Sequence, residues 1–316
     1  MEARQTERTD FDVVIVGGGP AGLSAALVLG RMRRTVLVCD TDDPANAVSH
    51  GIGGLLSRDG IPPHELRAIS REQIAKYPSV EFRGLQVLEA SREREIFSLL
   101  VGDERVRARK VLLAHGLDYA LPEIPGIASL WGEAIFHCPY CHGWEVRDRR
   151  IGVIVTSERA VNQALLLRPL SDDIVVFRNE NGELDEEALH RLDTCGVPLV
   201  EGPITAVESD GDRVRTVVAG REPVICDALF IQTELTLRND LASQLGAKLD
   251  GEGAIAVDSA GATDVAGLRA AGDAALPPQA VAAALGCGTV AAYAINAELA
   301  LEPFEQGSPV AGADPV

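Results

Sequence analysis

Two cysteines separated by two residues carry the most distinctive chemistry in this sequence. They are Cys138 and Cys141, in the segment FHCPYCHGWE, and a histidine stands on either side of them. C-x-x-C serves as half of a zinc site, as a structural clip, or as a redox pair that alternates between dithiol and disulfide. A histidine of ordinary pKa, about 6.5, can accept a thiol proton near neutral pH. We expect His142 to be such a base, with His137 as the second candidate and packing or hydrogen bonding as the alternative for both.

The rest of the cysteine pattern favours the redox interpretation. A structural zinc site needs about four ligands, and the sequence has neither a second C-x-x-C nor an H-x-x-x-H. The other cysteines occur singly, at Cys39, Cys195, Cys226 and Cys287. We therefore expect no metal.

A glycine-rich turn near the N-terminus indicates a dinucleotide site. The segment GGGPAG contains Gly17, Gly19, Pro20, Ala21 and Gly22. It joins an expected strand (11–16) to an expected helix (23–32), and Asp40 ends the next expected strand (35–40). In this arrangement the glycines let the backbone approach a pyrophosphate, and the acid takes a ribose hydroxyl pair. The motif alone does not distinguish an FAD site from an NAD site or from a glycine turn without a ligand.

Hydrophobic periodicity places further elements along the chain. We expect helices at 63–77, 158–167 and 279–301, and strands at 81–88, 95–101, 110–114, 151–155, 173–177, 197–207, 213–218, 228–232 and near 267–273. Two strand-helix-strand units result, which predicts an α/β protein whose second domain is inserted into the first. The Pro-, Gly- and acid-rich end, 303–316, is expected to be a flexible tail.

Composition limits the partners. The chain has 316 residues, with 29 basic against 47 acidic side chains and a net charge of −18, which argues against nucleic acid as a partner. No run approaches the ~20 apolar residues of a membrane span, and the N-terminal segment does not resemble a signal peptide. We expect a cytoplasmic protein that does not associate with membranes.

Three motifs together resemble those of low-molecular-weight thioredoxin reductases. GGGPAG, C-x-x-C and the AAGD that ends at Asp273 occur in that family's order from Phe11 to about Leu301. The resemblance implies a homodimer with a flavoprotein disulfide-reductase-like fold: an FAD domain (1–119 and 237–316) and an inserted, degenerate NADPH-type domain (120–236). It also implies FAD contacts at Asn46, His50, Val87, Ala114, Gly116, Gly272, Asp273, Ala280 and Val281. His115 replaces the threonine usual in the family's A-T-G turn.

The inserted domain departs from the family where it should bind NADPH. A second pyrophosphate would need glycines after strand 151–155, but 155–160 read Val-Thr-Ser-Glu-Arg-Ala, with Arg159 as a partial substitute. At the end of the next strand, Arg178 is followed by acids instead of an arginine cluster: Glu180, Glu183, Asp185, Glu186 and Glu187. We therefore expect NADPH binding to be lost, with a variant pocket as the alternative.

The segments CPYCHGWE and ANAVSHGIGGLLSRDGIPP resemble dithiol oxidases that close disulfides in holomycin-type and gliotoxin-type natural products. The resemblance implies that Cys138 meets a small-molecule dithiol, that Cys141 lies against FAD, and that O2 accepts the electrons to give H2O2. One alternative is a thioredoxin reductase-like enzyme that uses NADPH weakly or takes electrons from ferredoxin, although a charge of −18 disfavours an acidic ferredoxin. Another is a non-catalytic flavin redox sensor.

Overall fold

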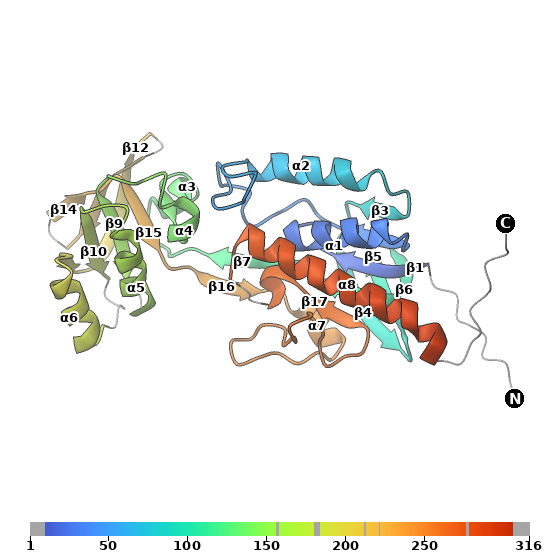
Figure 1. The fold of residues 1–316 in the computed structure, drawn as a ribbon. Coiled ribbons are helices and arrows are strands. Elements are labelled where there is room, and N and C mark those ends of the chain that lie inside the picture. Colours follow the sequence, from blue (N-terminus) through green and yellow to red (C-terminus); the bar gives the residue numbers. More distant parts are fainter. Residues whose placement is uncertain are drawn as a thin grey trace, which may run out of the picture. The chain divides into compact units, whose positions relative to one another are not determined.

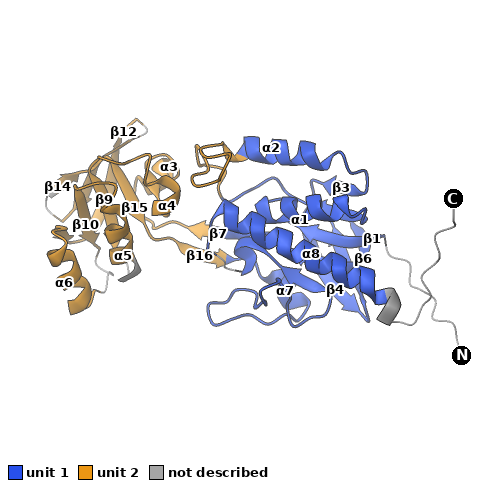
Figure 2. Cartoon of the chain, viewed as in Figure 1, with its two compact units in different colours: residues 1–45, 64–118, 237–316 blue, residues 46–63, 119–236 orange. Residues whose placement is uncertain are grey.

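The computed structural model describes residues 10–155, 158–179, 184–211, 213–220, 222–275 and 278–305; for 158, 159, 222 and 303–305 it describes the backbone alone. The chain divides into two compact units (Figure 2). Unit 1 comprises Met1–Ala45, His64–Asp118 and Leu237–Val316, and unit 2 comprises Asn46–Pro63 and Tyr119–Thr236. The sequence analysis assigned 46–63 to the first domain, whereas the contacts of this segment place it in unit 2.

Unit 1 is built on a seven-stranded sheet, visible with its helices in Figure 1. Four parallel strands form its centre in the order β3 (Val80–Arg83), β2 (Val36–Cys39), β1 (Phe11–Val16) and β6 (Glu104–Leu113). β17 (Leu268–Ala270) pairs parallel with β6, while β5 (Ile96–Val101) and β4 (Val87–Glu93) continue antiparallel. The central strands are apolar on both faces because both faces are covered, as expected for a parallel sheet.

Two helices cover one face of this sheet. α1 (Pro20–Arg31) and α8 (Val281–Glu305) form a core with β1 and β2 that includes Leu29, Ile15 and Ile295. The helix backbones pack closely: a Cβ at Gly288 of α8 would lie 2.0 Å from the Ala21 carbonyl oxygen of α1. α2 (Pro63–Ile74) contributes Ile74 to the same core, and α7 (Asp240–Gln244) packs Leu241 into the core on the other face.

Unit 2 contains a second, five-stranded parallel sheet. Its order is β11 (Leu199–Glu201), β10 (Ile174–Arg178), β9 (Ile151–Val155), β15 (Ala228–Ile231) and β8 (Ile135–Phe136). α5 (Glu158–Leu167) and α6 (Glu186–Thr194) share one of its cores. The antiparallel strands β12 (Ile204–Asp210), β13 (Arg213–Ala219) and β14 (Glu222–Ile225) form the other core with α3 (Ile127–Leu130). A ribbon of β7 (Leu117–Ala120) and β16 (Glu234–Leu237) contains the points where the chain passes between the units.

Several expected elements were wrong in extent, and three of these bear on the strand order or the tail. The strand expected at 81–88 is two strands, β3 and β4, which lie at opposite ends of the strand order of unit 1. The strand expected at 197–207 is also two, because Gly202, with φ 128°, turns the chain from β11 to β12. The last helix continues to Glu305, so 303–305 belong to α8, while the rest of the expected tail lies outside the described residues.

One helix is long and apolar enough to cross a membrane by length and composition, namely α8 over 281–302. This is weak evidence, since core helices of soluble proteins pass the same test. In unit 1, Glu298 and Glu302 of this segment form ion pairs with Lys110 at 2.9 and 2.7 Å, and Glu298 also pairs with Arg269. Because both acids are paired with residues of unit 1, α8 has a structural role in that unit.

Candidate active site

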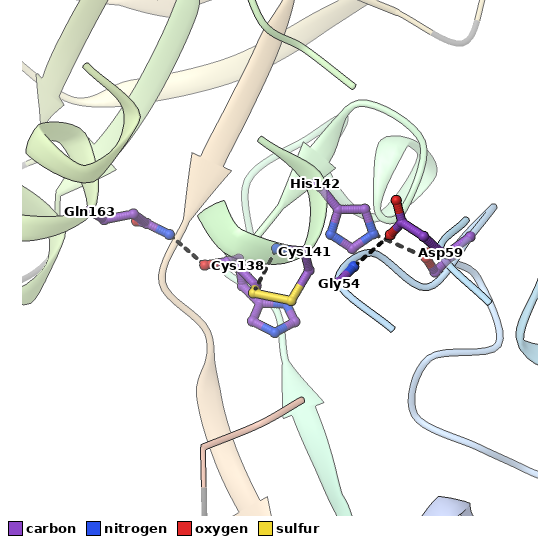
Figure 3. The surroundings of a disulfide bond; sticks show 9 residues. Gly54, Asp59, Cys138, Cys141, His142 and Gln163 are labelled. Atoms are coloured by element: carbon purple, nitrogen blue, oxygen red, sulfur yellow. Dashed lines mark hydrogen bonds between the residues drawn. A yellow bond between two sulfur atoms is a disulfide. The ribbon is translucent and has the colours of Figure 1, made fainter. Parts of the chain in front are cut away.

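The two cysteines of the C-x-x-C segment form a disulfide in unit 2 (Figure 3). Cys138 precedes the short helix α4 (Pro139–His142), and Cys141 lies in its single turn, with a Cα–Cα distance of 5.3 Å. The Cys141 backbone N–H donates to Cys138 Sγ at 3.2 Å. The same N–H would stabilise a thiolate on Cys138 in the reduced protein, and the thiolate is the form that attacks disulfides.

No metal arrangement accompanies this pair. Among the residues that the structure describes, no group of three or more His, Cys, Asp or Glu side chains could hold a metal ion. The zinc interpretation of C-x-x-C therefore gains no support from the described part of the chain. The four remaining cysteines are free, and burial raises the pKa of Cys39 and of Cys226 to about 12.

His142 directly follows the second cysteine and is held by two contacts. Its ring stacks on Phe136 with centroids 4.6 Å apart and planes 11° apart. Its Nε2 lies 3.0 Å from Ser49 Oγ, while Nδ1 is buried without a hydrogen-bond partner. Burial lowers the pKa of His142, and the charge of His50 lowers it further. The imidazole is therefore neutral at pH 7 and able to accept a proton.

His137 lies among aromatic rings, and its pKa is strongly lowered. Its ring centroid lies 4.7 Å from that of Tyr119 and 5.6 Å from that of Trp131, so it is one member of an aromatic cluster. Burial, with a smaller contribution from His142, lowers the pKa of His137 to about 4. A base this weak is poorly matched to a thiol whose ordinary pKa is about 8.5. These contacts support His142 over His137 as the proton acceptor.

Residues 46–63 form a loop against the dithiol. A Cβ at Gly53 would lie 2.3 Å from the Cys141 carbonyl oxygen, so only glycine permits this approach. Figure 3 shows His142 with the nearby loop residues Gly54 and Asp59, where the Gly54 N–H donates to Asp59. His50 forms an ion pair with Glu133. The backbone carbonyl oxygen of Asn46 accepts a hydrogen bond from the Ser49 backbone N–H at 3.1 Å. The expectation that Asn46 and His50 contact flavin stays a prediction.

A cavity of about 270 Å³ lies beside His142 within unit 2. Charged and aromatic side chains line it, including His50, Glu133, Phe136, Glu145 and Arg149. The cavity leaves room for water or another small group next to the imidazole.

The GGGPAG turn of unit 1 has the form of a pyrophosphate cradle. A Cβ at Gly17, where φ is 107°, would lie 2.3 Å from the Ala114 carbonyl oxygen, and one at Gly22 would lie 1.9 Å from the Gly17 carbonyl oxygen. Gly19, the N-cap residue of α1, has open space where its Cβ would lie, and Pro20 begins the helix. Closed packing at two glycines and open space at the third are what the dinucleotide motif requires.

The acid expected to bind ribose already has partners. Asp40 Oδ2 accepts hydrogen bonds from Arg67 Nη2 at 2.6 Å and Arg71 Nη2 at 2.5 Å, both on α2. Burial would raise the pKa of Asp40, but the two arginines and the Asp42 N–H hold it below its ordinary value. The sequence analysis missed both arginines, since nothing local links α2 to the end of β2. The assignment of Asp40 to a ribose stays a prediction.

The AAGD segment places a carboxyl group in a half-buried position. Gly272 has φ 70°, and Asp273 follows it in a single 3-10 turn. Burial raises the pKa of Asp273 to about 6, and the described residues provide its carboxylate with no hydrogen bond or ion pair. Ala280 and Val281 lie at the start of α8, where the Ala280 N–H donates to the Pro278 carbonyl oxygen. A half-buried acid with no partner among the described residues fits a position where ligand hydroxyls complete the site.

His115 adds a second unsatisfied polar group to unit 1. It follows Ala114 at the end of β6, its Nδ1 lies 3.2 Å from the Gly116 carbonyl oxygen, and its Nε2 is buried without a partner. Gly116 has φ 71° and open space at its Cβ position. Val87, by contrast, is buried in the unit 1 core. A bound dinucleotide, which is the group expected here, would fit these features: it would use the open space at the glycines and provide partners for Asp273 and His115.

The second nucleotide-type unit keeps the strand and helix of its frame, but its sequence has no glycine-rich turn between them. β9 and α5 occupy the strand and helix positions, but no glycine stands between Val155 and Ala160. Arg178, at the end of β10, forms an ion pair with Glu201 at 3.2 Å. Thr156, Ser157, Glu180 and Glu183 lie outside the described residues, as do the side chains of Glu158 and Arg159.

Comparisons with known proteins agree with this architecture. The chain is 32% identical over 288 residues to "Thioredoxin reductase tcpT" of Claviceps purpurea, covering 83% of this chain and 86% of that one. It is 33% identical over 187 residues to a "Probable thioredoxin reductase" of Arthroderma benhamiae, 57% of this chain and 46% of that longer protein. The crystal structure of HlmI superposes with a TM-score of 0.90 at 38% identity, covering 94% of this chain and 95% of HlmI.

The family model described as "Pyridine nucleotide-disulphide oxidoreductase" matches residues 11–288. This range includes the glycine turn, the dithiol and the AAGD segment. The thioredoxin-reductase-like fold inferred from the sequence motifs is confirmed by these matches. The chain belongs to the FAD-binding pyridine nucleotide-disulphide oxidoreductase family.

Proposed function

We propose that this protein is an FAD-dependent dithiol oxidase, which forms an intramolecular disulfide in a small-molecule dithiol and passes the electrons to O2. The observation that carries the proposal is the redox pair Cys138–Cys141 beside a neutral His142, in a protein whose second nucleotide-type unit has no glycine loop. Electrons then enter through the dithiol instead of NADPH.

The charges around β10 support the loss of NADPH binding. A 2′-phosphate site requires free arginines that can hydrogen-bond the phosphate oxygens. Here the guanidinium of Arg178 is paired with Glu201, on the neighbouring strand β11. Asp185, Glu186 and Glu187 follow at the start of α6, where Asp185 is the N-cap. Added negative charge at this position opposes the binding of a phosphate.

The protein's own residues account for the thiol exchange. One substrate thiol transfers its proton to His142, and its sulfur bonds to Cys138 Sγ while the Cys138–Cys141 bond breaks and its electron pair leaves on Cys141. The second thiol of the same substrate then attacks the substrate sulfur that is bonded to Cys138, which closes the product disulfide, and the departing Cys138 sulfur takes the proton of that second thiol. The product is oxidised by two electrons, and the protein retains Cys138 as thiol and Cys141 as thiolate.

FAD would supply the two-electron transfer from the protein dithiol to O2, with H2O2 as product. The residues that would hold it are the glycine turn with Pro20 and Ala21, the Ala114–Gly116 turn, and the AAGD segment with Ala280 and Val281. Their geometry fits the group, because Gly19 has open space at its Cβ position, His115 Nε2 is buried without a partner, and the Asp273 carboxylate has no partner among the described residues. By the same family resemblance, we propose a cytoplasmic homodimer.

A thioredoxin reductase-like activity is the second candidate. It is favoured by the printed names of the Claviceps and Arthroderma relatives. Such an enzyme would use NADPH weakly or receive electrons from a donor such as ferredoxin. The two candidates differ in the direction of electron flow through the same disulfide.

Anaerobic mixing separates them. The flavin-loaded protein is mixed with NADPH, with reduced ferredoxin or with dithiothreitol, and flavin absorbance near 450 nm, roughly, is followed. We expect bleaching by the dithiol alone, with H2O2 formed when air is admitted. Cys138→Ser should abolish the response, whereas Cys195→Ser, which removes an exposed free thiol of unit 2, should not. Rapid bleaching by NADPH would refute the oxidase assignment.

A further inference from the structure

Ser49 connects the loop 46–63 to the histidine beside the dithiol. Its hydroxyl donates to the Gly51 carbonyl oxygen at 2.8 Å. The same oxygen lies 3.0 Å from His142 Nε2, although 93 residues separate the two side chains in sequence. Ser49 is thus a candidate for controlling the catalytic imidazole.

The hydrogen-bond inventory of Ser49 fixes the protonation pattern of His142. A hydroxyl has one proton, and a carbonyl oxygen can only accept, so the proton of Ser49 is used on Gly51. Ser49 Oγ can then only accept from His142, which requires the hydrogen of the neutral ring to be on Nε2. The lone pair is therefore on Nδ1, the atom that is buried without a partner.

The ring has little freedom to exchange its two nitrogens. Phe136 stacks on one face at 4.6 Å, and a flip would put the unprotonated nitrogen against an oxygen that has no proton to give. The ionisable groups that line the cavity beside the ring are His50, Glu133, Glu145, Arg149, Arg213 and Asp227, and His137 also interacts electrostatically with it. None of these forms a hydrogen bond with either ring nitrogen among the described residues.

We propose that Ser49 is a positioning residue that holds His142 as its Nε2–H tautomer, so that Nδ1 is the ring atom left with the basic lone pair. The proposal rests on the dithiol-oxidase function, in which a thiol must lose its proton before it attacks Cys138. Without Ser49, both neutral tautomers become populated, and the ring can rotate away from Phe136.

Imidazole 15N chemical shifts test the tautomer directly. Long-range 1H–15N spectra report which ring nitrogen carries hydrogen, and with 6 histidines the signals of His142 can be assigned by their loss in His142→Gln. We expect Nε2–H in the wild type, a mixture of tautomers in Ser49→Ala, and the wild-type pattern in Ser49→Thr, which keeps the hydroxyl. An Nδ1–H tautomer in the wild-type protein would overturn the proposal, even if Ser49→Ala did not fold.

The rate of disulfide reduction provides the functional test. The single-turnover reaction of the flavin-loaded protein with dithiothreitol is measured between pH 5.5 and 8.5, roughly. Ser49→Ala should lower the rate at pH 7 by about twofold to tenfold, the range given by one neutral hydrogen bond, and shift the lower limb of the pH profile. Ser49→Thr should restore both. Ser129→Ala is the matched control, because Ser129 also donates to a carbonyl oxygen, that of Gly126.

The results separate the two proposals. If Ser49→Ala leaves the tautomer, the rate and the pH profile unchanged, Ser49 has no positioning role, and the oxidase function stands. If dithiothreitol fails to reduce the wild-type protein, the oxidase function fails, while the tautomer measurement still decides the role of Ser49.

Discussion

Asp273 should destabilise the flavin-free protein at neutral pH, and Asp273→Asn should reverse this. Burial raises the pKa of Asp273 from 3.8 to about 6. Because the folded protein binds the proton more tightly than the unfolded chain, stability is lost as pH rises from 3.8 through about 6. The loss reaches about 3 kcal/mol by pH 8, from 2.2 pKa units at about 1.4 kcal/mol each, and is about 1.6 kcal/mol at pH 5.

The difference between two pH values isolates this effect. The side-chain amide introduced by Asp273→Asn does not titrate, so its own burial cost is the same at pH 5 and pH 8. Urea unfolding of the flavin-free wild type and of Asp273→Asn gives the change in the free energy of unfolding caused by the substitution. This stability gain should be about 1.4 kcal/mol larger at pH 8 than at pH 5.

Asp258→Asn is the control for this measurement. Hydrogen bonds from the Ala262 and Ala260 N–H groups lower the pKa of Asp258, so its carboxylate is ionised at both pH values. Its substitution should cost the same stability at pH 5 and pH 8. An effect of Asp273→Asn that does not change with pH would show that Asp273 has a solvated or paired carboxylate, and the reasoning would be wrong.

Three further predictions follow from the glycine turn, the aromatic cluster and the AAGD segment. Gly22→Ala should abolish flavin retention or folding, because the new Cβ would lie 1.9 Å from the Gly17 carbonyl oxygen. Gly19→Ala has open space at its Cβ position, so this variant should fold and lose flavin affinity. Flavin absorbance and circular dichroism check both variants. His137→Phe should remove part of the acid destabilisation of unit 2, since the pKa of His137, about 4, lies below its unfolded value of 6.5. Stability is lost as pH falls between these values, by at most about 3.5 kcal/mol from 2.5 pKa units at about 1.4 kcal/mol each, and thermal unfolding against pH measures this loss. Asp273→Asn should also weaken FAD binding in titrations of the flavin-free protein, and unchanged affinity would place the carboxylate away from the ligand.

Local signals in the sequence predicted the parts of the fold that depend on short-range order. The β1–α1–β2 unit follows from an apolar run, a glycine turn and an amphipathic helix, all within Phe11–Cys39. The disulfide follows from two cysteines in one turn of chain. These features depend on residues a few positions apart, and their steric requirements can be read directly from the glycine positions.

Long-range pairings were not visible in the sequence. Ser49 meets His142 across 93 residues and His50 meets Glu133 across 83, and each is an ordinary polar residue by itself. Arg67 and Arg71 on α2 could have been placed near Asp40 only by knowing that α2 returns to the end of β2. The strand at 81–88 looked continuous because apolar content does not show that the chain moves to another part of the sheet.

The protonation state of His142 bears on the direction of electron flow. A reductase that opens a substrate disulfide must give a proton to the leaving thiolate, which favours a cationic acid near the dithiol. An oxidase must first remove a proton from an incoming thiol, which favours a neutral base. Burial and the charge of His50 lower the pKa of His142 and keep it neutral at pH 7. A neutral His142 is thus able to accept a proton from a thiol, which supports the oxidase direction that we propose.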